Sequence, residues 1–310
     1  MDTALLRGQI CQKSPCSPFK PAVRRFQRVC LPLIGAIILC IIGNKAGKIL
    51  IATAAPNFTG CGGEQVTVVN ADFEAQVAEL VNIRRAEQGL PPMKLVDTLG
   101  NAARYHAADL RQDNYFEHDT YDRINGDLAQ VCAWYERILV YYPSPRAENI
   151  ASGYTSPESV MADWMNSASH RPNILGNNRE LGVGFYENRW VQDFGTRSDV
   201  YPLLINAEAR QTDTFDVTLY IYGTWQEMRL RNDADAWGEW IPFSSETDWT
   251  LNAVAGLRTV EVELRSGVKT ATSSDSIELT TGEAPAPTPT PTPPPPVNLD
   301  LKTFLPMVER

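Results

Sequence analysis

The chain has 310 residues, a hydrophobic fraction of 43% and a formal net charge of -9. This length fits two domains plus segments that do not fold, and the hydrophobic fraction is sufficient for real cores. The first 54 residues hold eight Lys and Arg and one acid, so 20 basic and 36 acidic residues remain downstream. A surface this acidic repels phosphate backbones and anionic lipid, which excludes nucleic acid and peripheral membrane binding for the region after residue 54.

The first 54 residues have the composition of an export signal. A basic stretch ends at Arg28, an apolar run follows over residues 29–43, and Ala52-Thr53-Ala54 forms a small-x-small cleavage pattern. The apolar run is shorter than the roughly 20 residues that a membrane-spanning helix needs. We therefore expect a cleaved signal and a secreted or cell-surface protein.

A retained signal anchor is the alternative for residues 1–54, because the basic region is long and Lys45 and Lys48 precede the small residues. In that case the N-terminal segment would be the chain's membrane contact. A lipoprotein signal ending at Cys61 is disfavoured, because Phe58 is unsuitable three residues before the cysteine and the apolar run lies far upstream.

The cysteines agree with export, since four of the six lie in the first 54 residues. Cys61 and Cys132 remain, and neither has the spacing of a metal ligand set. In an oxidising compartment they can form a disulfide, but their separation in sequence does not determine whether they meet. A catalytic cysteine is disfavoured.

Helices and two strands are predicted over residues 70–197, after a linker at 55–69. Apolar residues recur at helical spacing from residue 70 until Gly89, and again over about residues 97–114. Ser156 and Pro157 are typical of a helix start, as the N-cap and the first helical residue. Residues 181–186 and 190–195 then alternate as two strands joined by a turn. This mixture predicts an α+β domain.

Strand-like segments follow from about residue 212 to 281, and they predict a small antiparallel β-sandwich-like domain for binding or spacing. Residues 282–297 are rich in Pro and Thr, which predicts an extended linker. The apolar tail at 298–310 is too short to span a membrane. We expect it to be an anchoring or sorting tag or, alternatively, a frayed terminus.

Two of the three histidines follow predicted helices in polar segments. His118 comes after the second helix and His170 after the third, with Glu148 between them in sequence. His106 instead lies within the second helix on its apolar side, which predicts a packed core residue. His118, Glu148 and His170 are therefore the candidates for a functional site.

Five sequence blocks make the region around these residues similar to a known family. They are Tyr115-Phe-Glu-His118, Ala147-Glu-Asn-Ile150, Trp164 to Leu175, Leu181-Gly-Val-Gly184 and Trp190 to Gly195. Together they resemble the CAP superfamily in its bacterial SCP-like form, and the resemblance covers residues 70–197 only. It implies an α-β-α sandwich with a central cleft, where a His and Glu cluster holds a divalent ion in some members.

The resemblance also assigns residues to this cleft. His118 and Glu148 match the family's first His and the Glu of its Gly-Glu-Asn motif, and His170 matches the bacterial variant. Asn149 and Gln192 are further candidates for the cleft. Because Gln192 and Asp193 are neighbours on a strand, at most one of them can face it.

The chain departs from the eukaryotic members of the family at several positions. Ala147 replaces the usual glycine, and Ser167 and Arg189 stand where those members have their second Glu and second His. The eukaryotic ligand set is therefore incomplete, and a metal site would depend on His118, Glu148 and His170.

Two imidazoles and one carboxylate suit Zn²⁺ or another divalent cation, with a water in the fourth position. The cation would lower the pKa of that water and permit weak hydrolysis. The alternative is that the three side chains hydrogen-bond one another and fix the loops at the helix ends. No cofactor is required by the sequence.

Three functions remain open. The first is a secreted or surface-displayed protein whose cleft binds an extracellular lipid, glycan or protein. The second is a metal-assisted hydrolase that uses His118, Glu148 and His170. The third is a structural surface module without a ligand. The resemblance favours the first, because CAP proteins are widely secreted and seldom have an agreed reaction.

Overall fold

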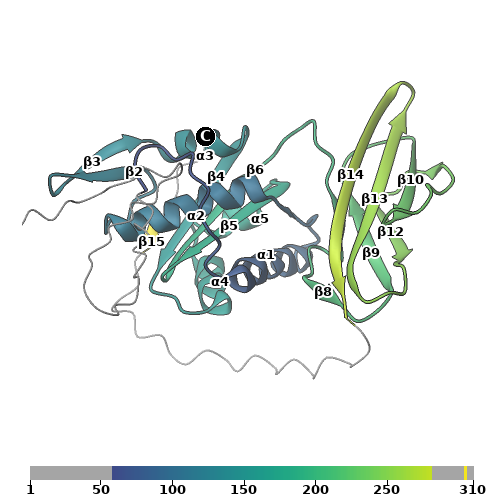
Figure 1. The fold of residues 1–310 in the computed structure, drawn as a ribbon, viewed down its shortest axis with the longest axis horizontal. Helices are drawn as coiled ribbons and strands as arrows, with labels where there is room; N and C mark the ends of the chain where they lie inside the picture. The colour runs from purple at the N-terminus through teal and green to yellow at the C-terminus, as the bar shows by residue number, and fades with distance from the viewer. Residues whose placement is uncertain (1–57, 281–303, 306–310) are drawn as a thin grey trace, which may run out of the picture. The chain divides into compact units, whose positions relative to one another are not determined.

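The computed structural model describes residues 58–280 and a short strand at 304–305 (Figure 1). Residues from Asn57 onward belong to one compact unit. The predicted export signal and the proline-rich linker lie outside the described residues, as does all of the tail except that strand. No helix among residues 58–280 has both the length and the apolar content needed to cross a bilayer.

A five-stranded sheet forms the centre of the first part of this unit. Its order is β1 (Lys94–Leu95), β5 (Glu180–Tyr186), β6 (Arg189–Gly195), β4 (Pro145–Ser152) and β15 (Phe304–Leu305). Only the β1–β5 pair is parallel. Strands β5 and β6 form the predicted hairpin, and its two turn residues, Glu187 and Asn188, both have positive φ, as the tight turns that suit twisted strands require.

Helices cover both faces of this sheet (Figure 1). Helices α1 (Ala71–Ala86), α4 (Pro157–Asn166) and α5 (Arg171–Leu175) pack on one face around Trp164 and Trp190. Helix α2 (Asp97–Gln112) packs on the other face against Ile150 and Val191, with α3 (Trp134–Tyr141) beside it. The predicted starts of α1 and α4 are confirmed, because Asn70 and Ser156 accept hydrogen bonds from the backbone of their first turns.

The contact between α2 and β5 depends on two glycines. A Cβ atom added to Gly182 would lie 2.2 Å from the carbonyl carbon of Leu99, and one added to Gly184 would lie 2.2 Å from that of Ala103. The helix backbone therefore occupies the space that side chains would fill, and α2 lies directly on the strand. This close approach determines where the residues that follow α2 are placed.

We expect Gly184→Ala to lower the free energy of unfolding by about 1–3 kcal/mol, because its methyl group can be accommodated only if α2 moves. Gly100→Ala, from the helix side of the same layer, is the control. Its added Cβ would meet only the flexible end of Arg104, and Ala favours helix over Gly by about 0.5–1 kcal/mol. Denaturant unfolding of both variants measures the difference, and equal stabilities would contradict this account of the packing.

Several elements of this region were missed by the sequence prediction. They are the hairpin of β2 (Thr120–Ile124) and β3 (Asp127–Cys132), helix α3 and strand β4. The residues of β3 are largely exposed, whereas Ala147 to Ala151 of β4 are all buried, so neither strand shows the alternation of a half-buried strand. Cys132 at the end of β3 forms a disulfide with Cys61, with 5.7 Å between their Cα atoms.

The strands after residue 202 form two further sheets. One has the order β11-β10-β13-β14-β8 and the other β12-β9-β7. The bounds are β7 (Leu203–Ile205), β8 (Gln211–Thr212), β9 (Asp216–Ile221), β10 (Glu227–Asn232), β11 (Ile241–Pro242), β12 (Glu246–Thr250), β13 (Gly256–Ser266) and β14 (Lys269–Leu279). Buried side chains from both sheets, such as Leu219 and Val262, belong to one hydrophobic cluster.

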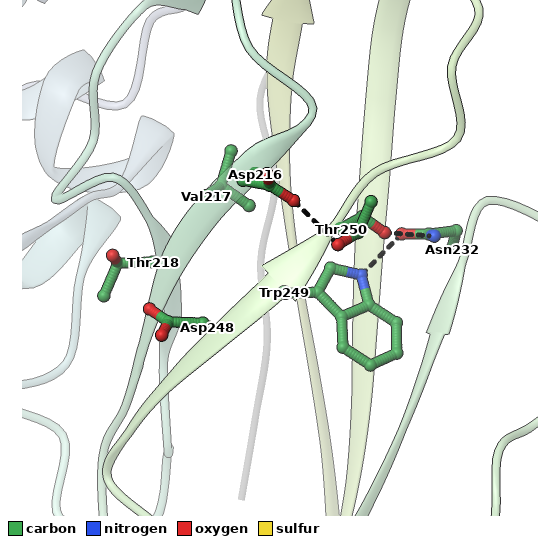
Figure 2. Close-up of a pocket in the computed structure, with 7 residues that line it drawn as sticks. All are labelled: Asp216, Val217, Thr218, Asn232, Asp248, Trp249 and Thr250. Carbon is green, nitrogen blue, oxygen red and sulfur yellow. Dashed lines mark hydrogen bonds between the residues drawn. The ribbon is translucent and has the colours of Figure 1, made fainter.

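An open pocket of about 760 Å³ lies on β9 and β12. Figure 2 shows its polar lining, in which Trp249 donates to Asn232 at 2.6 Å and Thr250 donates to Asp216 at 2.9 Å. None of the side chains predicted to form the functional site lines this pocket.

Candidate functional site

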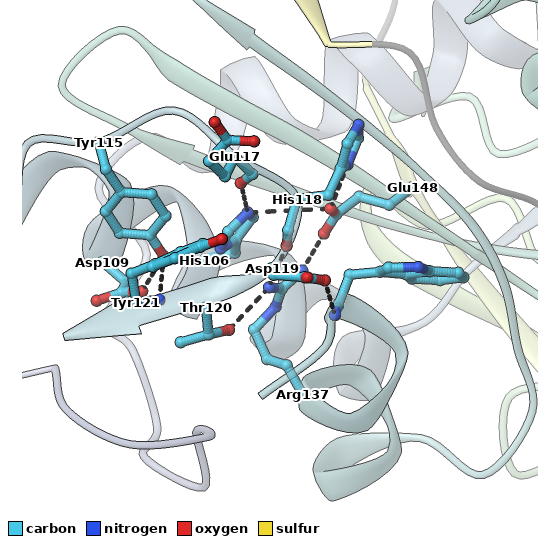
Figure 3. A network of polar contacts seen from close by, with 11 residues as sticks. His106, Asp109, Tyr115, Glu117, His118, Asp119, Thr120, Tyr121, Arg137 and Glu148 are labelled. Carbon is cyan, nitrogen blue, oxygen red and sulfur yellow. Dashed lines mark hydrogen bonds and ion pairs between the residues drawn. The ribbon is translucent and has the colours of Figure 1, made fainter. Parts of the chain in front are cut away.

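The site is centred on Glu148, a fully buried residue of β4. His118, in the segment between α2 and β2, places its Nδ1 2.8 Å from Oε1 of Glu148 (Figure 3). Since a carboxylate only accepts hydrogen bonds, Nδ1 carries the proton in this pair. The side chain of His118 is 13% exposed and that of Glu148 is not exposed. His118 is therefore the residue of this pair that is accessible to solvent.

Arg137 of α3 neutralises the buried carboxylate. Its guanidinium is fully buried and donates to Oε2 of Glu148, and also to the backbone oxygen of His118 at 2.9 Å and to Thr120 at 3.0 Å. Burial opposes ionisation of Glu148, but Arg137 and the neighbouring imidazoles outweigh it and lower its pKa to about 2. The network therefore contains a carboxylate that is ionised at neutral pH.

His106 of α2 also borders Glu148, at 3.9 Å from Nε2 to Oε1. Its Nε2 lies 3.0 Å from the carbonyl oxygen of Glu117, so this nitrogen carries the proton and donates. Burial, followed by the charge of Arg137, lowers the pKa of His106 well below its usual range. The prediction that His106 is a buried core residue is confirmed, but its position beside Glu148 was not foreseen.

Asp193 of β6 lies opposite Glu148 in the strand register and is fully buried. Burial, followed by the charge of Glu148, raises the pKa of Asp193 well above its usual range and so favours its neutral form. The buried network thus pairs one anion, Glu148, with one cation, Arg137, and the pKa shifts of His106 and Asp193 favour their neutral forms. This balance explains how so many ionisable groups occupy one layer of the fold.

His170 belongs to a different group of polar side chains. Its Nδ1 lies 2.7 Å from the hydroxyl of Ser167, and its backbone oxygen accepts from Asn149 at 3.3 Å. The amide of Asn149 also donates to Gln192 at 3.1 Å and accepts from Asn173 at 2.8 Å. This second group lies next to α4 and α5.

The strand positions place the five candidates on two faces of the sheet. Glu148 and Asn149 are consecutive on a strand, so their side chains leave opposite faces of the sheet, as do Gln192 and Asp193. The hydrogen bonds above join His118 to Glu148, whereas those of His170 and Gln192 go to Asn149. Asp193, not Gln192, accompanies Glu148.

Within residues 58–280, Asp109, Asp113 and Asp122 form one cluster of potential metal ligands. Their carboxylate oxygens lie within 4.8 Å of one another. Over the same described residues, His118, Glu148 and His170 do not form such a group.

Arg137 and Asp193 were not among the predicted site residues, and His106 was predicted only as a core residue. Arg137 lies on α3, a short helix that was not predicted. Asp193 was considered only as an alternative to Gln192. Its pairing with Glu148 requires the β4–β6 register, which depends on the unpredicted strand β4. Of these three residues, His106 alone had a sequence feature that could have indicated a site, because it is a polar residue on the apolar face of a helix.

Comparisons with known proteins agree with the blocks that surround the site. The profile of the CAP family, described as the cysteine-rich secretory protein family, matches residues 78–194. YkwD of Bacillus subtilis is 37% identical over 156 residues, which are 49% of this chain and 56% of that protein. The B. subtilis membrane protein YlbC is 27% identical over 129 residues, 41% of this chain and 35% of that protein. The matches thus span about half or less of these relatives.

Two solved structures are also similar over part of the chain. An extracellular protein with an SCP domain from Bacillus anthracis is 25% identical, with a TM-score of 0.37 over 43% of this chain and 45% of its own. An outer surface protein from Borrelia burgdorferi is 23% identical, with a TM-score of 0.33 over 39% of this chain and 90% of its own. The family match and the similarity to YkwD agree with the sequence blocks around His118 and Glu148, and they identify residues 78–194 as a CAP domain of the bacterial type.

Proposed function

We propose that this protein is a secreted or surface-displayed binding protein, whose CAP domain recognises an extracellular lipid, glycan or protein next to His118. The strands after residue 202, as a β-sandwich-like module, and the proline-rich linker would present the domain. The Cys61–Cys132 disulfide supports a location outside the cytoplasm, because such bonds persist in oxidising compartments.

The observation that carries the proposal is the electrostatic balance around Glu148. Its oxygens accept from Arg137 and His118, and its pKa of about 2 makes it a poor proton acceptor at neutral pH. A general base works best with a pKa near the operating pH. The network is therefore suited to fixing the orientation of the His118 ring at the surface rather than to moving protons.

The metal-assisted hydrolase is the less favoured function. It needs His118, Glu148 and His170 around one ion, whereas Glu148 already accepts from Arg137 and His118, which favours a fixed hydrogen-bond network. The structural module without a ligand is tested by the same experiment as the binding protein.

The experiment uses the exported protein and its variants His118→Ala, His170→Ala and Arg111→Ala. Arg111 is the matched control, because it is a half-exposed residue whose ion pair with Glu187 lies outside the network. Each protein is titrated with phospholipid vesicles, with amino-sugar oligosaccharides and with Zn²⁺ plus a chromogenic ester. We expect one of the first two probes to bind wild type and Arg111→Ala with equal affinity. The same probe should bind His118→Ala at least about ten-fold more weakly at unchanged melting temperature, because the variant loses a central contact of the recognition surface.

Other outcomes would overturn the proposal. Zn²⁺-dependent ester hydrolysis that is lost in both His118→Ala and His170→Ala would establish the hydrolase instead. Equal binding by His118→Ala and wild type would remove His118 from the recognition surface. Failure of every vesicle and oligosaccharide probe, together with failure to retain any extracellular protein from the native culture, would leave the structural module.

A further inference from the structure

The C-terminal end of the chain returns to the CAP sheet. Strand β15 pairs antiparallel with β4, with Phe304 opposite Ala151 and Leu305 opposite Ile150 (Figure 1). The pairing ends one residue from Asn149 and two from Glu148. A segment from the end of the chain thus lies along the strand that supplies both polar groups described above.

Strand β4 would be an edge strand without this partner. The sheet order places β6 on one side of β4 and only β15 on the other, among the described residues. Each edge strand offers a row of backbone N–H and C=O groups to any extended peptide, and proteins usually cover or interrupt such edges. The side chains of Ala147 to Ala151 are all buried, so an opened β4 edge would have no row of charged side chains to discourage pairing.

The contact is short and tethered. The strand is two residues long, and Pro306, which follows it, has no backbone N–H to extend the ladder. Residues 281–303 separate it from Thr280, a length that spans at most roughly 80 Å when extended. Because the strand is covalently linked to the domain, its pairing with β4 is intramolecular, which favours the chain's own strand over a free competitor. A pairing this small also opens readily.

From these observations we infer that the outer edge of β4 is a strand-addition site, and that the chain's own residues 304–305 occupy it in cis. An extended peptide can add to such an edge through backbone hydrogen bonds. The resident strand protects the edge from other chains, and it controls access to the strand that carries Glu148 and Asn149. This inference does not depend on the identity of the ligand bound next to His118.

Hydrogen exchange of three forms of the secreted protein tests the site. The first is wild type, the second ends at Thr280, and the third carries Phe304→Pro with Leu305→Pro, which cannot form the strand. Asn298→Pro is the matched control, because it adds a proline outside the paired residues. We expect peptides covering β4 to exchange at least about ten-fold faster in the second and third forms than in wild type and the control. Peptides from α2 should exchange equally in all four proteins, which separates edge opening from unfolding.

A synthetic peptide of residues 298–310, added at millimolar concentration, should restore the slow exchange of the shortened chain, whereas a scrambled peptide should not. Unchanged exchange of β4 in the shortened chain and in the double proline variant would overturn the inference. The inference would also be overturned if the slow exchange of β4 in wild type were lost on dilution, because the pairing strand would then come from a second copy of the chain.

Discussion

Replacing Arg137 by Met should destabilise the protein by about 3–5 kcal/mol, because Glu148 would remain as a buried carboxylate without its cation. Both side chains are fully buried, and burial alone would disfavour the charge of each. Chemical denaturation measures the loss. Arg84→Met is the control for removing a guanidinium, since Arg84 pairs with Glu87 in an exposed position, where such pairs contribute about 0–1 kcal/mol.

Two further variants test the charge balance of the network. In Arg137→Met with Glu148→Gln, both charges are absent, so the double variant should be more stable than Arg137→Met alone. Asp193→Asn should change stability by less than about 1 kcal/mol, because burial favours the neutral form of Asp193 and asparagine is also a neutral hydrogen-bonding group. If Asp193→Asn proved as damaging as Arg137→Met, Asp193 would be ionised and the charge balance of the network would be wrong.

Loss of the Cys61–Cys132 disulfide should be the other large effect. The bond joins residues 71 positions apart, and removing a disulfide from a small secreted domain costs about 2–5 kcal/mol, since the unfolded chain regains the freedom that the bond restricts. We expect Cys61→Ser with Cys132→Ser to lose stability in this range in thermal or denaturant unfolding. The segment before α1 should loosen first, where Gly60 donates to Asp122 and Gly63 donates to Tyr141.

Reduction provides the matched comparison for the disulfide. Wild type in the presence of a thiol reductant should become as unstable as the double serine variant, and the variant itself should not respond to the reductant. A reductant that leaves wild type unchanged, together with a double variant of wild-type stability, would show that the two thiols are not joined in the exported protein.

Elements with local signals were predictable from the sequence. Helices α1 and α4 begin at the capping residues Asn70 and Ser156, and the β5–β6 hairpin follows from two alternating strands around a short turn. Elements whose existence depends on distant partners were not. Strand β4 is buried on both faces, so its residues show neither a period of two nor a helical period.

The same division applies to the candidate site. Family blocks led to His118 and Glu148, and the structure brings these two side chains together. The blocks also pointed to His170, whose Nδ1 lies 2.7 Å from the hydroxyl of Ser167 and whose place in a shared site stays a prediction. Arg137 was unpredictable because it enters the network from a helix without a distinctive pattern, and its partner lies 11 residues away on another element.

The most direct test of the buried charge balance is a ¹³C NMR titration of the Glu148 carboxyl group in the folded protein, with and without Zn²⁺. Our account predicts that this carboxyl stays ionised as the pH falls from about 7 to about 4, because Arg137 lowers its pKa to about 2, and that Zn²⁺ leaves its signal unchanged. A midpoint near the ordinary value of 4.5, or a Zn²⁺-dependent shift that His170→Ala abolishes, would contradict it.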